Sequence, residues 1–450
     1  MIDWEATQRE VTGYLQDLIR IDTTNPPGNE IEAARFLGGV LQREGFEPRI
    51  TESAPGRGNV TARLRGGTQP PLLLLGHTDV VAAEPDKWTH PPFGGELRDG
   101  YVWGRGALDM KNMVAAELMV TLLLKRQGHS LDRDLIFAAT ADEEAGKGDH
   151  GPGWLLDHHP AQIEAPFIIT EGGGADLEVG GARFFTCQTG QKGICRFRAT
   201  TSGRPGHGSM PHDENAVLRL CRSLGGMQGV QLPLHSSATM AAFIEGVAAH
   251  QDDETAVLLR QVLDPRHSES ALRQLSIEED LKAELRAVLR NTASVTMLQA
   301  GSKINVIPAS ATAWIDGRLA PGQTQESFFA ELRPHMGTAV EIEVDQYSPP
   351  LEAGADTELY RTIVAVMGTH VPEATVVPAI SNGGTDAKHI CPRRPDTQVY
   401  GFMPYRQAPG EEEMMLVHGH DERTSVENLL FATRVLYDIV RRFCGLGQEE

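Results

Sequence analysis

A run of four leucines at 72–75 leads directly into the segment Gly-His-Thr-Asp-Val at 76–80. The apolar run predicts a buried strand, and residues two positions apart on a strand face the same side. A metal-binding imidazole needs its second ring nitrogen held by a hydrogen-bond acceptor, and Asp79 can supply that acceptor to His77. Taken alone, a histidine that leaves a strand is more often an ordinary hydrogen-bonded side chain than a ligand. The rest of the chain therefore decides whether this strand end binds metal.

Composition limits the compartment and the partners of the protein. A chain of 450 residues is expected to form two or three domains. Its formal net charge of -20 disfavours nucleic acids and anionic membrane surfaces as partners, because both require clusters of Lys and Arg. The five cysteines are scattered without a CxxC pair, which favours a reducing compartment. The N-terminal segment lacks the apolar region of a signal peptide, and no run of about 18 apolar residues occurs, so we expect a soluble cytoplasmic protein.

Hydrophobic periodicity predicts strands that alternate with helices in both terminal parts of the chain. Helical spacing is present at 5–20, 31–44, 110–126 and 425–443, and β-like runs are present at 59–64, 71–76, 134–140 and 166–170. This alternation predicts the α/β class, with a sheet covered by helices on both faces. From 187 to 347 the predicted order becomes β-α-β-β-α-β, typical of a small two-layer domain, with a helix-rich insertion at about 235–290. The large domain is thus predicted to be discontinuous, at 1–186 and 348–450.

Four further segments place metal-ligand residue types at a strand end or beside a predicted helix. They are GRGALDMK with Asp109, ATADEEAG with Glu143 and Glu144, IITEGGG with Glu171, and LVHGHDERTS with His418. Because ligands gather at the carboxyl ends of strands in open α/β sheets, these side chains are expected to converge with His77. Two histidines and three carboxylates can hold two zinc ions, and a bridging hydroxide would make the cluster neutral. Adjacent glutamates in extended backbone point to opposite sides, so one can bind metal while the other acts as a base.

The motifs GHTDVV, GRGALDMK, DEEAG, EGGG, KINVIP, GGTDAK and HGHDER, in this order and across nearly the whole chain, resemble those of the M20 family of co-catalytic zinc peptidases and aminoacylases. That family includes acetylornithine deacetylase, succinyl-diaminopimelate desuccinylase, aminoacylase-1 and the glutamate carboxypeptidases. The resemblance implies a large catalytic domain with a mixed sheet that binds two Zn²⁺ per subunit, and an inserted α+β lid domain that forms a homodimer. It implies that Asp109 bridges the ions, with His77 and Glu171 completing one site and Glu144 and His418 the other. Co²⁺ or Mn²⁺ can also occupy such a mixed nitrogen and oxygen site.

The same resemblance assigns the catalytic groups. Glu143 is implied to be the general base and acid, and Asp79 the partner of His77. His207, in the segment GRPGHGSMPHDENA, is implied to polarise the scissile carbonyl from a second subunit. A water deprotonated by Glu143 attacks the carbonyl, and no covalent intermediate is required.

The resemblance also implies the class of substrate. The positions that hold a substrate carboxylate match Asn305, Arg318, Gly384 and Thr385, and Arg318 offers a guanidinium fork for that group. The expected reaction is therefore hydrolysis of an amide bond next to a free carboxylate. The substrate is expected to be a small N-acyl-L-amino acid or a short peptide, which makes the protein a deacylase or a dipeptidase/carboxypeptidase.

Simpler interpretations of single residues stay open at this stage. Asp109 alone is as readily a helix N-cap as a ligand, and adjacent glutamates such as Glu143 and Glu144 are usually a solvated charge pair. Arg318 can be a surface-facing strand residue, and His207 can cap a turn. At the level of function, the alternatives are a catalytically silent protein of this fold that binds amino acids or a partner, and a di-zinc esterase or lactam hydrolase. The insertion at 235–290 leaves the oligomer open, and the preferred acyl group and side chain are not specified.

Overall fold

The computed structural model describes residues 2–128, 130–146, 148–407 and 413–445, and the chain divides into two compact units. The larger unit contains 1–189, 353–379 and 385–450, and the smaller unit contains 190–352 and 380–384. The boundaries expected from the sequence lie a few residues from these, but no sequence pattern indicates that 380–384 belongs to the smaller unit. Within that unit, the backbone N–H of Lys192 donates to the carbonyl oxygen of Ser381 over 2.9 Å, which ties the two stretches together.

The larger unit is built on a mixed sheet with the strand order β1-β2-β6-β3-β7-β18-β9. Its central strands run parallel, and they are β6 (Arg133–Thr140), β3 (Gln69–His77), β7 (Phe167–Thr170) and β18 (Gln398–Gly401). Antiparallel strands flank them, namely β1 (Arg49–Ala54) and β2 (Arg57–Leu64) on one side and β9 (Ala182–Gln191) on the other. Two further strands, β8 (Asp176–Val179) and β17 (Ala374–Ser381), also pair with β9.

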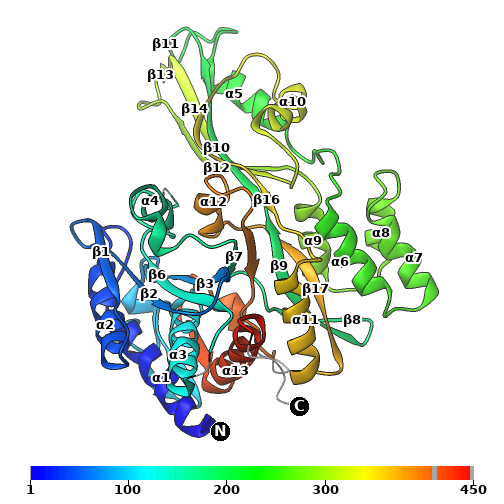
Figure 1. Cartoon of the computed structure of the whole chain (residues 1–450). Helices are drawn as coiled ribbons and strands as arrows, with labels where there is room; N and C mark the ends of the chain where they lie inside the picture. The colour runs from blue at the N-terminus through cyan, green and yellow to red at the C-terminus, as the bar shows by residue number, and fades with distance from the viewer. Residues whose placement is uncertain (1, 129, 147, 408–412, 446–450) are drawn as a thin grey trace. The chain divides into compact units, whose positions relative to one another are not determined.

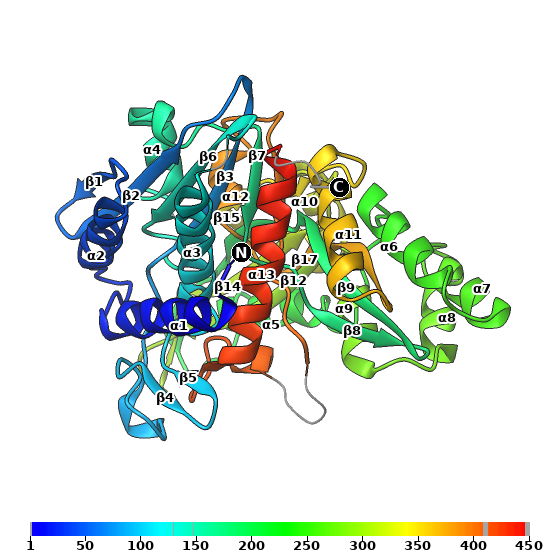
Figure 2. The ribbon, with the colours of Figure 1, turned by 60° about the horizontal axis from the view of Figure 1, so that its bottom comes forward.

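Alternation along β3 explains its uninterrupted apolar run. Leu72 and Leu74 belong to a core on one face of the sheet, whereas Leu73 and Leu75 belong to a core on the other face. Because a parallel strand covered on both faces buries every side chain, four consecutive leucines suit this position. The first face packs against α1 (Trp4–Arg20), α2 (Glu30–Arg43), α3 (Lys111–Gln127), α11 (Glu358–His370) and α13 (Val426–Phe443), of which α1, α3 and α13 are seen together in Figure 2. The second face packs against α4 (Pro152–His158) and α12 (Ala387–Ile390).

The smaller unit is an α+β structure with an antiparallel sheet in the order β12-β14-β10-β15. These strands are β10 (Gly193–Ser202), β12 (Thr292–Ala300), β14 (Ser310–Leu319) and β15 (Glu341–Ser348), and α5 (Ala216–Gly225) and α10 (Gln325–Met336) pack against the sheet (Figure 1). The short strands are β11 (Gly206–His207), β13 (Val306–Ile307) and β16 (Leu351–Glu352). The region expected to be a helix-rich insertion contains α6 (Ala238–Ala248), α7 (Asp253–Gln261), α8 (Ser268–Gln274) and α9 (Glu279–Val288).

Short elements complete the larger unit. A small sheet has the order β19-β5-β4, formed by β4 (Glu96–Arg98), β5 (Tyr101–Trp103) and β19 (Arg423–Ser425), and the 3-10 turns are η1 (Pro85–Lys87), η2 (Pro160–Gln162) and η3 (Glu413–Leu416). The helices and strands predicted from periodicity are confirmed, with ends shifted by one or two residues. Within the described ranges, no helix has both the length and the apolar content needed to cross a membrane.

Candidate metal centre

Three of the predicted ligands follow the carboxyl ends of neighbouring parallel strands. His77 is the last residue of β3, Glu144 follows β6, and Glu171 follows β7. The other two come from loops, because Asp109 lies just before α3 and His418 lies between η3 and β19. The sheet order β6-β3-β7 brings the three strand ends next to one another, which is the convergence expected for an open α/β sheet.

Asp109 lies between two histidines. Its Oδ1 is 3.1 Å from His77 Nε2, and its Oδ2 is 3.1 Å from His418 Nε2. Each histidine also faces a second carboxylate, since His77 Nε2 is 3.7 Å from Glu171 Oε2 and His418 Nε2 is 3.2 Å from Glu144 Oε1. The five side chains therefore form two triads that share one aspartate.

The cluster has the chemistry of a divalent-cation site. Ligand atoms of His77, Glu143 and Glu171 lie within 4.8 Å of one another, and so do those of His77, Asp109 and Glu144. Imidazoles together with carboxylates suit Zn²⁺, Co²⁺ or Mn²⁺. Burying this many carboxylates without cations is costly, because each loses its hydration. The residues present therefore fit a pair of divalent cations.

Burial and mutual pairing displace the pKa values of the cluster. Burial raises the pKa of Glu171 to about 8, and it raises the pKa of Glu144 as well. Hydrogen bonds with Asp109 and Glu144 raise the pKa of His418 to about 10. Burial favours the protonated form of Asp109, but hydrogen bonds from the two histidines outweigh it and hold the pKa of Asp109 below its ordinary value. Because ligands bind metal in their deprotonated forms, a cation has to displace the protons that this cluster holds.

The adjacent glutamates Glu143 and Glu144 have different partners, as expected for neighbours that point to opposite sides. Glu144 faces His418, whereas the Glu143 carboxylate accepts a hydrogen bond from Lys388 Nζ. Glu143 and Lys388 expose only 8% and 6% of their surfaces, so they are not a solvated charge pair. Burial alone would lower the pKa of Lys388, but the charges of Glu143 and Asp386 raise it. Lys388, in the motif NGGTDAK, thus keeps its ammonium group beside the predicted general base, and sequence reasoning missed it.

Asp79 makes more contacts than the sequence predicted. His77 Nδ1 lies 3.0 Å from the backbone oxygen of Asp79 and 3.5 Å from its Oδ1. The Asp79 carboxylate accepts hydrogen bonds from the backbone N–H of Glu143 over 3.2 Å, from the backbone N–H of Glu144 over 3.1 Å, and from Asn25 Nδ2 over 2.8 Å. Asp79 therefore orients His77 mainly through its main chain, while its side chain fixes the turn that carries both glutamates.

A buried ion pair that sequence reasoning also missed positions Asp109 and His418. The guanidinium of Arg105 pairs with the carboxylate of Glu422. Glu422 Oε1 accepts hydrogen bonds from the backbone N–H of Leu108 over 2.7 Å and of Asp109 over 3.2 Å. Arg105 Nη2 donates to the carbonyl oxygen of His418 over 3.2 Å. The sequence offered no signal that singles out this pair, because GRGALDMK and HGHDER each contain charges of both signs.

In the smaller unit, His207 and Asn305 lie in adjacent segments. β11 pairs with β13, and the backbone N–H of Gly208 donates to the carbonyl oxygen of Asn305 over 2.8 Å. The exposed ring of His207 has its Nδ1 2.7 Å from Ser209 Oγ and 3.2 Å from the backbone nitrogen of Ser209. Because that backbone N–H can only donate, Nδ1 accepts, and the neutral ring carries its proton on Nε2. His207 thus has an N–H donor at Nε2, which is the group that polarising a carbonyl requires.

Arg318 lies on β14, where part of its guanidinium is already engaged. Its Nε is 2.7 Å from Asp316 Oδ1, its Nη2 is 3.3 Å from Asp316 Oδ2, and its Nη1 donates to the carbonyl oxygen of Asn382 over 3.3 Å. Gly384 ends the 380–384 segment of the smaller unit, and the buried Thr385 begins the next segment of the larger unit. A substrate carboxylate at Arg318 would therefore compete with Asp316.

Solved structures share this fold. An M20 family metallo-carboxypeptidase, Sso-CP2 from Sulfolobus solfataricus, matches with a TM-score of 0.69 at 19% identity, covering 98% of this chain and 99% of that chain. A dinuclear metal-binding peptidase of the M20 family, YXEP from Bacillus subtilis, matches with a TM-score of 0.61 at 16% identity, covering 98% and 99% of the two chains. The chain therefore shares the fold of these M20 peptidases, with a larger α/β unit and a smaller α+β unit.

Sequence comparison defines the family. The model of the peptidase family M20/M25/M40 matches residues 73–442, so the chain belongs to this family. The N-fatty-acyl-amino acid synthase/hydrolase PM20D1 of Xenopus tropicalis is 29% identical over 374 residues, which cover 79% of this chain and 69% of the relative. Aminoacylase-1 of Sus scrofa is 28% identical over 432 residues, which cover 93% of this chain and 91% of the relative. The protein is a metal-dependent hydrolase that acts on amide bonds.

Proposed function

We propose that the protein hydrolyses an amide bond next to a free carboxylate, in N-acyl-L-amino acids or short peptides, with two Zn²⁺ ions bound by its larger unit. The observation that carries the proposal is the position of Asp109 between His77 and His418, with one carboxylate oxygen directed at each. The names of two relatives, an N-fatty-acyl-amino acid hydrolase and an aminoacylase, favour a deacylase over a dipeptidase. A panel of N-acyl amino acids, dipeptides and matched esters tests this. Hydrolysis of esters alone, or of no member of the panel, would contradict it.

The candidate ligands divide into two sets with one shared member. His77, Asp109 and Glu171 would hold one cation, and Asp109, Glu144 and His418 the other. When bound, the cations lower the pKa of the attacking water and polarise the substrate carbonyl.

We assign the proton transfers to Glu143, because it is buried beside the cluster and belongs to neither of these two sets, although its carboxylate lies near His77 and Glu171. Glu143 accepts the proton of the attacking water and later returns it to the leaving amine. Lys388 stabilises the carboxylate form of Glu143 before the first transfer and after the second. The Nε2–H of His207 would stabilise the oxyanion that forms on the carbonyl.

Removal of metal should abolish activity. We expect exhaustive dialysis against a chelator to lower the rate to background and added Zn²⁺ to restore it, because the water and the carbonyl lose their activating charge. Elemental analysis of the same samples should find two ions per chain before dialysis and none afterwards. Turnover that persists in protein shown to be free of metal would contradict the assignment.

Arg318→Ala should weaken the binding of substrates with a free carboxylate more than that of their amidated analogues. Because Asp316 already engages part of the guanidinium, we expect KM for the acid substrate to rise by about tenfold, with a smaller change in kcat. Asp316→Asn is the matched variant, since it frees the guanidinium and should keep or lower KM. Equal losses on acid and amide substrates would remove Arg318 from carboxylate recognition.

We further infer a homodimer formed through the smaller unit, supported by the contrast between the two edges of its sheet. The edge strand β12 carries no charged residue, and it exposes Val295, Met297 and Leu298 by 44%, 59% and 59%. The opposite edge strand β15 carries Glu341, Glu343 and Asp345, charges of the kind that keep an edge strand from pairing. The uncharged edge is therefore available to pair with β12 of a second copy in a twofold interface.

The cysteines support the cytoplasmic location expected from the sequence. None forms a disulfide in the part of the chain that the structure describes, and the five thiols belong to Cys187, Cys195, Cys221, Cys391 and Cys444. Unpaired thiols in this number are typical of a reducing compartment. We assign the protein to the cytoplasm on this ground.

A further inference from the structure

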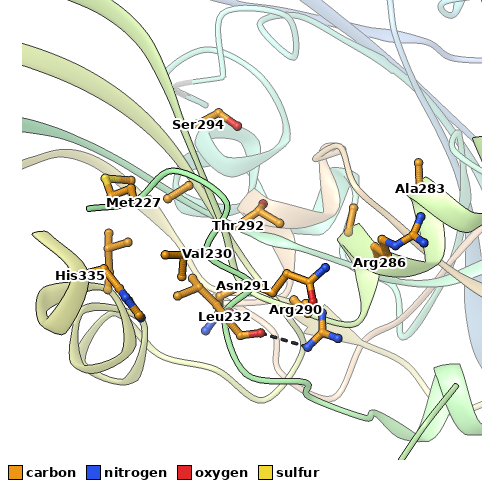
Figure 3. A pocket seen from close by; sticks show the side chains of 14 residues that line it. Met227, Val230, Leu232, Ala283, Arg286, Arg290, Asn291, Thr292, Ser294 and His335 are labelled. Atoms are coloured by element: carbon orange, nitrogen blue, oxygen red, sulfur yellow. Dashed lines mark hydrogen bonds between the residues drawn. The ribbon is translucent and has the colours of Figure 1, made fainter. Parts of the chain in front are cut away.

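The smaller unit contains a pocket that shares no residue with the candidate metal centre. Its volume is about 350 Å³, and it lies where α9 of the helical insertion meets β12, α10 and the segment 227–232. Figure 3 shows Arg286 and Ala283 at one end of the pocket and Met227 and His335 at the other. This volume is at the lower end of the range of small-molecule sites, about 300 to 1,000 Å³.

One wall of the pocket has an excess of positive charge. Arg286 Nε lies 3.2 Å from Glu269 Oε2, and Arg290 Nη2 lies 3.4 Å from Glu269 Oε1, so one carboxylate serves two guanidinium groups. Arg290 is held further by its Nη1, which donates to the carbonyl oxygen of Leu232 over 3.0 Å (Figure 3). The terminal nitrogens of Arg286 make no hydrogen bond within the described parts of the chain, and its side chain is 31% exposed. Glu269 thus neutralises only one of the two arginines, and the terminal donors of Arg286 are accessible.

The remaining lining combines an apolar strip with polar groups. Met227, Val230, Leu232 and Leu332 line it, and Leu332 is almost completely buried. Asn291, a polar group that also lines the pocket, is already satisfied, because its Nδ2 donates to Glu331 over 2.8 Å and its Oδ1 accepts from the backbone N–H of Ala320 over 2.9 Å. Gln231, Thr292, Ser294 and His335 also line the pocket, so the two arginines are its charged groups among several polar ones.

We propose that this pocket binds a small amphipathic monocarboxylate, with the carboxylate on Arg286 and the hydrocarbon chain along Met227, Val230 and Leu332. A carboxylate matches the guanidinium fork in shape, and its single charge balances the one that Glu269 leaves unpaired. The proposal is independent of the proposed reaction, since the pocket contains none of the residues assigned to catalysis or substrate binding.

Calorimetric titration of octanoate into the metal-depleted, full-length protein tests the proposal, and the same titration into metal-depleted Arg318→Ala removes the carboxylate-binding group proposed for the active site. We expect one saturable site. Octan-1-ol, which lacks the charge, and acetate, which lacks the chain, should each bind at least about tenfold more weakly. N-octanoylglycine also has one carboxylate and an octanoyl chain, but its carboxylate belongs to an amino acid. Tighter binding of octanoate would indicate a free fatty acid as the physiological ligand, and tighter binding of N-octanoylglycine would indicate an acyl amino acid.

Variants locate the binding. Arg286→Met, which keeps the packing of the side-chain stem, and Ala287→Phe, which fills the pocket from α9, should each weaken octanoate binding by about tenfold or more. Arg273→Met removes the same charge from the exposed face of α8 and should leave the affinity unchanged. Circular dichroism verifies that each variant is folded. Absence of octanoate binding to the unmodified protein, or binding that Arg286→Met leaves unaltered, would overturn the proposal.

Discussion

Replacement of Glu143 by alanine should lower kcat by about a thousandfold and leave both metal ions bound. We expect this because the two adjacent glutamates have different partners. Glu144 faces His418 in the cluster, whereas Glu143 is paired with Lys388. A general base that is not a ligand contributes to the transition state alone, so its loss appears in kcat rather than in metal content. Steady-state assays with an N-acyl amino acid measure kcat, and elemental analysis of the purified variant measures its metal content.

Glu144→Ala is the matched control, since it removes the same side chain from the neighbouring position. It should release one ion and regain activity at high Zn²⁺ concentration, whereas added metal should not rescue Glu143→Ala. Removal of Glu143 leaves the ammonium of Lys388 buried without its partner, which costs stability. The double variant Glu143→Ala, Lys388→Met therefore separates folding from catalysis and should be as inactive as the single variant. If Glu143→Ala lost metal and regained its rate on reloading, the roles of the two glutamates would be reversed.

The sequence was sufficient to predict the framework of the larger unit and the approach of the five candidate ligands. Buried parallel strands leave uninterrupted apolar runs such as 72–75, and in an open sheet their carboxyl ends meet at one edge. The local structure also excludes one of the two interpretations of Asp109, that of a helix N-cap. The N-cap of α3 is Met110, so Asp109 does not cap that helix and both of its oxygens face histidines.

The residues that hold the cluster in place were not predictable from one sequence. Arg105 and Glu422 are more than 300 positions apart, and Lys388 is separated from Glu143 by 245 positions. No local periodicity connects such pairs, because they are brought together only by the order of strands in the sheet. The same holds for segment 380–384, which contacts Lys192 and Arg318 of the smaller unit. Local patterns therefore predict which residues lie at a strand end, whereas tertiary structure determines which charges neutralise one another.

A mixed dimer of two inactive variants should recover activity. His207 lies in the smaller unit and the candidate ligands lie in the larger one, and the family resemblance implies that each active site uses His207 of the partner subunit. His207→Ala should lower kcat by about a hundredfold or more, since a donor to the oxyanion is lost, and Glu143→Ala should be less active still. In a heterodimer of the two, one site combines an intact Glu143 with an intact His207, while the other site carries both defects. Activity per heterodimer should then approach half of that of the unmodified dimer.

Native mass spectrometry verifies that the subunits have exchanged before activity is measured. Met297→Glu is a second control, because it introduces charge on β12 and should separate the subunits and prevent recovery. Tyr347→Glu makes a similar change on β15, whose residue 347 is 40% exposed, and should permit recovery. Confirmed exchange without recovery would mean that His207 acts within its own chain or has no catalytic role, and dimers that survive Met297→Glu unchanged would place the interface away from β12.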